Sequence, residues 1–315
     1  MRAGAQALSL LSNPINVYVL RALEDEPRPL SDLRRAVGSP QTTMRGHLRG
    51  LTETGIVERY RQDEFPGSVD YALGPAGRDL LGVARVLQDW LAESPDGPLP
   101  LESPAAKIAI KALTQGWSCA IVRALAARPL SLTELNKLIV ELSYPALERR
   151  LGAMRLAGQI EVCEGRGRST PYGPTPWLRR AVSPLAAAAH WEREHASAKT
   201  SPIGRIDVEA VFLLTVPVLP AVEDLDGTCR LVVDLRGDGA ALAGVTVQVS
   251  RGRVRRCVAK LKGNATGWAS GTAPAWLRAV GAGDLGLLEV GGDCVIPNAL
   301  IEGLGGALRG SRLLT

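Results

Sequence analysis

Residues 41–60 read Gln41-Thr-Thr-Met-Arg-Gly-His-Leu-Arg-Gly-Leu-Thr-Glu-Thr-Gly-Ile-Val-Glu-Arg-Tyr60, and this stretch decides how the first part of the chain folds. Met44, Leu48 and Leu51 recur at helical spacing and give a helix one apolar face. Gly55 is typical of the position that ends a helix, and the five residues after it have the composition of a strand. The pattern predicts a helix with a polar outer face, followed directly by a β-strand.

The residues on either side extend this pattern into a winged helix-turn-helix. Residues 15–23 have helical apolar spacing, and a short second helix begins at Leu30-Ser-Asp-Leu33 with Ser31 as its N-cap. Pro40 fits the first turn of the third helix. Three further elements complete the unit: a turn at 65–67, a returning strand at 68–73 and a long helix at 75–91. Two tightly joined helices and a hairpin are the parts of this DNA-binding motif.

The chain contains a second copy of the same unit. Val19-Leu-Arg-Ala-Leu23 matches Ile121-Val-Arg-Ala-Leu125, and Leu30-Ser-Asp-Leu33 matches Leu132-Thr-Glu-Leu135, both displaced by 102 residues. The later matches follow in the same order: Gly55-Ile-Val-Glu58 with Gly158-Gln-Ile-Glu161, Tyr71 with Tyr172, Pro75 with Pro176, and Trp90 with Trp191. A duplicated unit therefore fills the first 195 positions.

Two linker-like stretches divide the chain into three parts. Residues 94–100 and 196–202 are rich in proline, glycine, serine and other small residues. We expect winged helix-turn-helix units at 1–97 and 98–199, and a separate α+β region at 200–315. The predicted fold class is mainly α, with an α+β region at the C-terminal end.

Three motifs in the first copy carry a family resemblance: Pro29-Leu-Ser-Asp-Leu33, Leu48 through Arg59, and Pro66-Gly-Ser-Val-Asp-Tyr-Ala-Leu-Gly-Pro-Ala-Gly77 leading to Trp90. With them the first copy resembles the HxlR family of winged-helix transcription regulators, and the second copy keeps a weaker form in Thr170-Pro-Tyr-Gly-Pro-Thr-Pro-Trp177. That family generally works as a homodimer. The resemblance therefore implies a covalent pseudo-dimer whose last helices, around Trp90 and Trp191, pack together. It also implies double-stranded DNA as the partner, bound by a monomeric pseudo-dimer or by a homodimer of the chain.

The outer face of each third helix carries the residues expected to touch DNA. Glutamine and arginine can form paired hydrogen bonds to base edges in the major groove, and arginines in a wing can reach phosphates. The same residues suit a solvated helix face, but the winged-helix context favours DNA contact. The candidates are Gln41, Thr42, Arg45, Arg49, Arg59 and Arg61 in the first copy, and Tyr144, Arg149, Arg150, Arg166 and Arg168 in the second.

Charge is divided unequally between the two copies. The whole chain has a net charge of +5, but residues 1–97 hold eleven basic and thirteen acidic residues, whereas residues 98–199 hold fourteen and eight. Asp63 and Glu64 in the first wing would also repel phosphate. Either the two units read an asymmetric site, or the first unit has drifted towards a packing role.

The third region alternates short strands and helices. Asp207 is expected to cap a helix through Leu214, followed by strands at 228–235, 244–250, 254–261 and 287–293 and by helices at 274–280 and 297–308. Gly271-Thr-Ala-Pro-Ala-Trp-Leu277 and Leu288-Glu-Val-Gly-Gly-Asp293 make it similar to the sterol-carrier-protein-like fold, a small sheet with helices around an apolar cavity. The resemblance implies a pocket for a small apolar ligand. Its candidate lining residues, which also suit a plain core, are Phe212, Leu213, Trp276, Leu300 and Leu304.

Other functional classes have little support in the sequence. The five cysteines are scattered without a C-x-x-C, and the three histidines form no metal motif, so we expect no metal and no cofactor. Gly281-Ala-Gly-Asp-Leu-Gly286 matches G-x-G-x-x-G, but a helix precedes it and a strand follows, the reverse of a nucleotide-binding turn. No apolar run reaches the length of a membrane span and no signal-peptide layout opens the chain. We therefore expect a cytoplasmic protein that is not an enzyme.

Two functions fit these observations. The first is a DNA-binding transcription regulator that responds to a small apolar ligand or to a partner at its third region. The second is a non-enzymatic interaction protein that uses its winged helices to dock other proteins, which the acidic first copy favours. DNA affinity that falls steeply with salt separates the two, because phosphate contacts release counterions.

Overall fold

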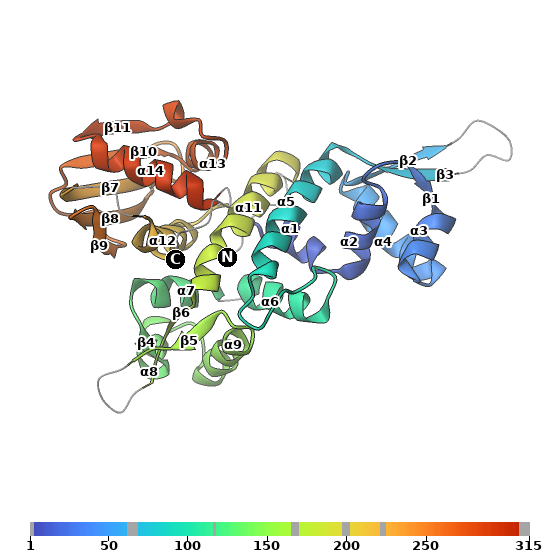
Figure 1. Ribbon diagram of the computed structural model, residues 1–315, viewed down its shortest axis with the longest axis horizontal. Coiled ribbons are helices and arrows are strands. Elements are labelled where there is room, and N and C mark those ends of the chain that lie inside the picture. Colours follow the sequence, from blue (N-terminus) through green and yellow to red (C-terminus); the bar gives the residue numbers. More distant parts are fainter. Residues whose placement is uncertain are drawn as a thin grey trace.

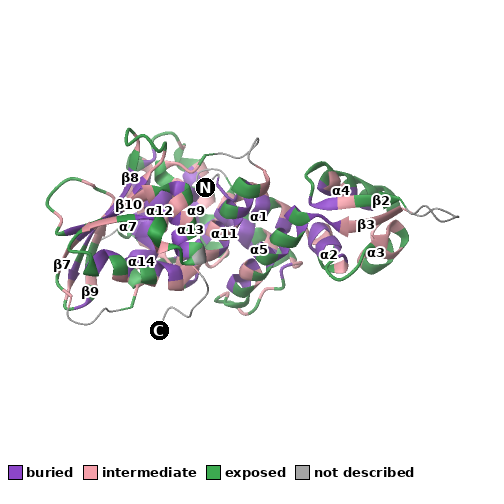
Figure 2. Ribbon diagram, turned by 90° about the horizontal axis from the view of Figure 1, so that it is seen from above, coloured by how far each residue is buried: buried purple, intermediate pink, exposed green. Residues whose placement is uncertain are grey.

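The structure is a computed structural model that describes residues 3–61, 69–115, 118–164, 170–196, 202–220 and 225–308. Three groups of elements follow one another along the chain (Figure 1), the first in blue, the second in green and the third in orange and red. Buried residues run through the helices at the centre of the molecule (Figure 2). No helix in the described part of the chain combines the length and apolar character needed to cross a bilayer.

The first group has the predicted order of a winged helix-turn-helix. It consists of α1 (Ala5–Leu11), α2 (Pro14–Ala22), β1 (Arg28–Pro29), α3 (Leu30–Val37), α4 (Gln41–Glu53), β2 (Val57–Arg61), β3 (Val69–Leu73) and α5 (Pro75–Ala92). The three strands form an antiparallel sheet in the order β1-β3-β2. Gly55 follows α4 with a φ of 69°, a conformation that glycine adopts without strain.

Two details of the first group differ from the sequence prediction. Ser31 is not an N-cap, because α3 begins one residue earlier at Leu30 and Pro29 occupies the cap position. The Ser31 hydroxyl instead donates to Asp32, 3.3 Å away. Pro40 precedes α4 as its N-cap residue and does not lie in its first turn. The predicted turn at residues 65–67 lies outside the described residues.

The second group repeats the element order of the first. It consists of α6 (Pro104–Thr114), α7 (Ser118–Ala127), β4 (Leu130–Ser131), α8 (Leu132–Leu138), α9 (Tyr144–Leu156), β5 (Ile160–Val162), β6 (Pro171–Pro174), α10 (Pro176–Arg180) and α11 (Val182–His195). Its sheet order, β4-β6-β5, matches that of the first group strand for strand. The one difference in order is that α10 and α11 stand where the first group has the single helix α5.

Helices α5 and α11 pack together through tryptophans that contact the opposite group. Trp90 donates its indole N–H to the carbonyl of Trp177 at 2.9 Å, and Trp191 donates to the carbonyl of Ala76 at 2.8 Å. Trp191 lies 101 residues after Trp90, and Trp177 lies 101 residues after Ala76, so the two contacts are equivalent under the sequence repeat. Equivalent reciprocal contacts are the mark of a two-fold interface.

The centre of this interface holds a second tryptophan contact. The Trp90 and Trp177 rings stack with centroids 4.3 Å apart and planes 3° apart, and Trp177 donates back to the Trp90 carbonyl at 2.7 Å. Both rings are buried, so the indole N–H groups need these protein acceptors. The packing therefore also fixes the register of one helix against the other.

The third group is an α+β unit with one mixed sheet. It consists of α12 (Arg205–Thr215), β7 (Gly227–Asp234), β8 (Leu242–Ser250), β9 (Arg253–Val258), β10 (Gly267–Thr272), α13 (Ala273–Ala282), β11 (Glu289–Gly292) and α14 (Val295–Leu308), with 3-10 turns at Val216–Val218 and Leu285–Leu287. The strand order is β11-β10-β7-β8-β9, and β10 runs parallel to β7. Strand β10 was not predicted. The N-cap of α12 is Gly204 and not Asp207, which lies at the third helical position and accepts the Gly204 N–H at 3.0 Å.

The third group is attached to the second through α12. Glu209 on α12 is 1% exposed and pairs with Arg123 on α7 and, at 2.6 Å, with Arg205. Arg179 on α10 donates to the Leu214 carbonyl at 2.9 Å, and Ser183 on α11 donates to the Leu308 carbonyl at 2.6 Å. A buried carboxylate is stable only when its charge is paired, so this contact fixes where α12 sits on α7.

The first helix is held to α11 by a buried carboxylate. Glu192 accepts N–H bonds from Gly4 at 2.8 Å, Gln6 at 2.6 Å and Ala7 at 2.9 Å. These groups open α1, whose N-terminal amides have no partner within the helix. Glu192 thus joins the beginning of the first group to the last helix of the second.

Replacing this carboxylate tests its contribution. We expect Glu192→Ala to lower the free energy of unfolding by about 3 kcal/mol, because buried N–H groups that lose a charged acceptor cost roughly 1–3 kcal/mol each. Urea unfolding measures the change. Glu194→Ala, at an exposed position of the same helix, is the control and should leave stability unchanged. Equal stability of the two variants would show that Glu192 does not hold α1.

Candidate nucleic-acid interface and apolar pocket

Helix α4 presents a polar face to solvent because its apolar residues are turned into the first group. Met44, Leu48 and Leu51 are buried, as the sequence predicted. The four predicted DNA-contact residues of this helix are exposed: Gln41, Thr42, Arg45 and Arg49. A helix of this kind can enter the major groove, which accepts an α-helix and displays a distinct pattern for each base pair.

A hollow lies between α4 and the hairpin, and three of the predicted arginines line it. Arg45 and Arg49 come from α4, and Arg59 comes from β2. Arg49 donates to Glu53 at 2.8 Å, and this hydrogen bond raises the pKa of Arg49 above its usual range. The pair is exposed, so Glu53 can give way to a phosphate at little cost. Arg61, at the end of β2, is exposed on the same hairpin.

The corresponding helix of the second group, α9, has the same construction. Leu147, Leu151 and Met154 are buried, as predicted. Tyr144 is 45% exposed, and Arg149 is also exposed. Both side chains are therefore available to a ligand of this helix.

Arg150 does not share this exposed face. Its Nε donates to the Ser118 hydroxyl at 2.9 Å and its terminal nitrogen donates to the Gln115 carbonyl, so it ties α9 to the beginning of α7. Burial lowers the pKa of Arg150. Arg150 lies on α9 between Leu147 and Leu151, which both face inward. Its side chain therefore points towards the interior of the second group and not towards solvent. The structure corrects its placement from a DNA-contact face to an intramolecular contact.

Other predicted and unpredicted basic residues complete the surface. Arg166 and Arg168, in the chain between β5 and β6, lie outside the described residues, and their role stays a prediction. Arg34 and Arg35 are exposed on α3 and were not among the candidates. The sequence feature that could have identified them is an arginine pair at the end of α3. In this class of motif, the helix before the recognition helix crosses the DNA backbone.

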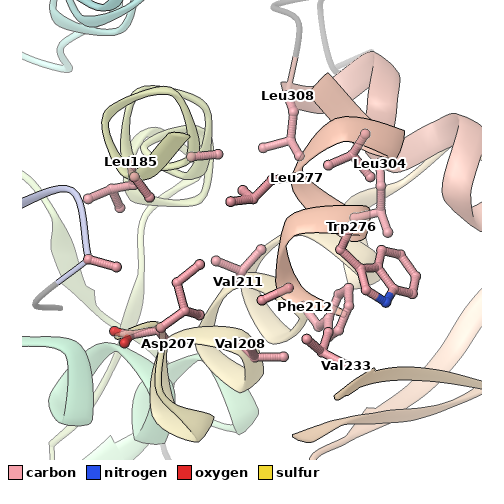
Figure 3. Close-up of a pocket in the computed structure, with 16 residues that line it drawn as sticks. Leu185, Asp207, Val208, Val211, Phe212, Val233, Trp276, Leu277, Leu304 and Leu308 are labelled. Atoms are coloured by element: carbon pink, nitrogen blue, oxygen red, sulfur yellow. The ribbon is translucent and has the colours of Figure 1, made fainter. Parts of the chain in front are cut away.

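An apolar pocket of about 100 Å³ lies where the third group meets α11 (Figure 3). Three of the predicted pocket residues line it: Phe212, Trp276 and Leu304. Their contact with a ligand stays a prediction. Trp276 meets Phe212 edge to face at 5.3 Å and donates to the Val232 carbonyl at 2.8 Å. The other lining residues are Ala3, Leu185, Ala186, Ala189, Ile203, Asp207, Val208, Val211, Val233, Ala273, Leu277, Val280 and Leu308.

Two predicted pocket residues are core residues instead. Leu213 follows Phe212 on α12, and one residue along a helix turns the side chain by about 100°, away from the pocket. Leu300 lies one turn before Leu304 on α14 and is buried without reaching the pocket. These two positions do not line this pocket, and their contact with a ligand stays a prediction.

The described residues offer no metal-binding cluster of three or more His, Cys, Asp or Glu side chains. All five cysteines are free thiols. Burial raises the pKa of Cys119, Cys229 and Cys257 to about 12, and it also raises the pKa of Cys163. Since the thiolate is the reactive form, these four thiols are protected at neutral pH.

The difference in exposure among the five cysteines predicts which thiol reacts first with a thiol reagent. At pH 8, dithiobis-nitrobenzoate should modify Cys294, the one exposed cysteine, in a single fast phase. The half-buried Cys163 and Cys257 should react more slowly, and the buried Cys119 and Cys229 only on unfolding. Absorbance of the released thiolate measures the phases. Cys294→Ser should remove the fast phase and Cys163→Ser should retain it. A fast phase that survives Cys294→Ser would contradict the protection of the other four thiols.

Comparisons with known proteins agree with the geometry of the first group. Residues 10–96 match the family described as HxlR-like helix-turn-helix. Two uncharacterized HTH-type transcriptional regulators, from Mycobacterium bovis and Mycobacterium tuberculosis, are each 33% identical to this chain over 96 residues, which is 30% of this chain and 61% of theirs. The chain therefore spans about three fifths of the length of these relatives.

A crystal structure described as a transcriptional regulator of the MarR family from Enterococcus faecalis V583 aligns with 27% of this chain and 78% of its own, at 28% identity and a TM-score of 0.26. The family match covers the segment that contains α2 to α5. Residues 10–96 form an HxlR-like helix-turn-helix domain, and the protein is homologous to HTH-type transcriptional regulators.

Proposed function

We propose that the protein is a DNA-binding transcription regulator in which two winged helix-turn-helix units of one chain act as a pseudo-dimer. The observation that carries the proposal is helix α4, which lies within the HxlR-like segment and exposes Gln41, Thr42, Arg45 and Arg49 above a buried apolar face. Helix-turn-helix regulators bind double-stranded DNA through such a helix. In this proposal the chain is divided into three units, at residues 1–97, 98–199 and 200–315.

The second unit is supported by two independent observations. Its elements follow the order of the first unit, with the same sheet order. The reciprocal tryptophan contacts of α5 with α10 and α11 relate equivalent residues, as a homodimer interface would. One chain would then present both α4 and α9 to DNA.

The two units are expected to read different half-sites. The helix α4 offers glutamine, threonine and arginine, whereas α9 offers Tyr144 and Arg149. Residues 98–199 also carry an excess of six basic residues, whereas residues 1–97 carry an excess of two acidic ones. We expect an asymmetric operator, with the second unit contributing more of the phosphate attraction.

The third unit is proposed to sense a small apolar ligand. The support is the pocket lined by Phe212, Trp276 and Leu304, together with a sheet-and-helix order similar to the sterol-carrier-like fold. No cofactor or catalytic step is part of the proposal. The second candidate function, protein docking by the winged helices, is favoured by the acidic balance of the first unit.

Titration of labelled DNA from upstream of the protein's own gene tests the proposal. We expect Arg45→Ala and Arg149→Ala each to weaken binding by about 1–3 kcal/mol, the range for a lost base contact, whereas a lost phosphate contact would reduce the salt slope by about one. Fluorescence anisotropy at several salt concentrations measures both quantities. Arg193→Ala, on the exposed side of α11, is the control.

The outcomes separate the two functions. Equal affinity for operator and random DNA, or no salt dependence, would contradict the regulator and favour protein docking. Loss of binding in Arg149→Ala alone would show that only the second unit reads DNA.

The second wing gives a separate prediction. We expect Arg166→Ala with Arg168→Ala to weaken binding to all DNA sequences by a similar factor and to reduce the salt slope by about two, because phosphate contacts carry little sequence information. The same anisotropy series measures the slope. An unchanged slope would remove the second wing from the DNA interface.

A further inference from the structure

The apolar pocket lies at a junction of units and not within one, and Ala3 of the first unit also lines it. One wall is α11, through Leu185, Ala186 and Ala189, and the opposite wall is formed by α12, α13 and α14. Figure 3 shows Val211 and Leu277 in the space between the helix of Leu185 and that of Trp276. A molecule in this pocket would therefore contact the third unit and the last helix of the second unit at once.

The chemistry of the walls selects an uncharged apolar molecule. Fifteen of the sixteen lining residues are apolar. The exception, Asp207, already accepts the Gly204 N–H at 3.0 Å and a hydrogen bond from the Cys119 thiol at 3.3 Å. A volume of about 100 Å³ approaches that of apolar cavities that bind a single aromatic ring. Phe212 and Trp276 add aromatic edges and faces suited to such a ring.

The helix that forms one wall also carries the contact between the two winged helices. α11 packs against α5, and Trp191 on α11 donates to the Ala76 carbonyl at the beginning of α5. The opposite wall is fixed elsewhere, because Glu209 on α12 pairs with Arg123 on α7. A ring between the two walls would therefore press α11 away from the wall anchored to α7, and through the packing of α11 on α5 it would act on the first unit.

We propose that this junction is an effector site for a single-ring uncharged aromatic compound, and that its occupancy changes the spacing of α4 and α9 and hence the affinity for DNA. The effect on DNA affinity rests on the proposed function, whereas ligand binding rests on the pocket alone. A ligand shifts such an equilibrium only by its difference in affinity between two arrangements, so the effect must be reciprocal: DNA must change ligand affinity by the same factor.

The probe is toluene, tested on the full chain. We expect toluene to raise Tm in a concentration-dependent manner, because a ligand that binds only the folded state stabilises it. Val211→Phe places a ring in the pocket and should abolish the shift. Ile206→Phe adds the same ring at an exposed position of the same helix and should retain it. Leu277→Ala, at a half-buried lining position, should extend the response to naphthalene.

DNA affinity is then measured with and without saturating toluene. We expect a change of at least about fivefold in the wild type and in Ile206→Phe, and none in Val211→Phe. No Tm shift in the wild type, or a shift that persists in Val211→Phe, would overturn the site. A pocket-dependent shift with unchanged DNA affinity would overturn the coupling. Absence of all DNA binding would refute the proposed function and the coupling with it, while the Tm series would still decide the ligand site.

Discussion

The arrangement of the molecule depends on the tryptophan contacts that α5 makes with α10 and α11. Each indole N–H of Trp90, Trp177 and Trp191 is buried and must find an acceptor inside the protein. A buried donor left without an acceptor costs about 1–3 kcal/mol, so sliding one helix along the other is unfavourable at each of these positions. Because the acceptors are carbonyls of the opposite group, the contacts fix both the distance and the register between the two groups.

Helix α11 is placed where several constraints meet. Its Trp191 contacts the first group, its Glu192 holds the beginning of α1, and its Leu185 and Ala189 form a wall of the pocket. One helix therefore contacts all three parts of the chain (Figure 2). Packed interiors transmit small displacements because they have little free volume, so α11 connects the third unit with the helices that we propose to contact DNA.

Much of the fold could be predicted from sequence periodicity. The spacing of Met44, Leu48 and Leu51 gave the inward face of α4, and the same pattern gave that of α9. The displaced repeats gave the order of the second group. These features depend on residues that are close together in the sequence, so the sequence alone is enough to predict them. Strand β10 was missed because Gly267–Thr272 has no alternation of apolar and polar residues, and its place in the sheet depends on pairing with β7.

At the candidate sites, the direction of a side chain depends on residues from other helices, which the local sequence does not indicate. Arg150 lies at the border of the buried face of α9, and only the position of Ser118 on another helix reveals that it is an internal contact. Leu213 and Leu300 were expected in the pocket from the resemblance to the sterol-carrier-like fold, which places the cavity inside the third group. Their burial was predicted correctly and their direction was not, because the pocket is closed by α11 from a different unit.

The central claim is that one chain reads two half-sites. Hydroxyl-radical footprinting of the operator, at a concentration where sedimentation shows one chain per DNA, tests it most directly. The pseudo-dimer predicts two protected segments whose centres are about one helical turn, or a whole multiple of it, apart. A single protected segment, or two segments that appear only when two chains are bound, would contradict it.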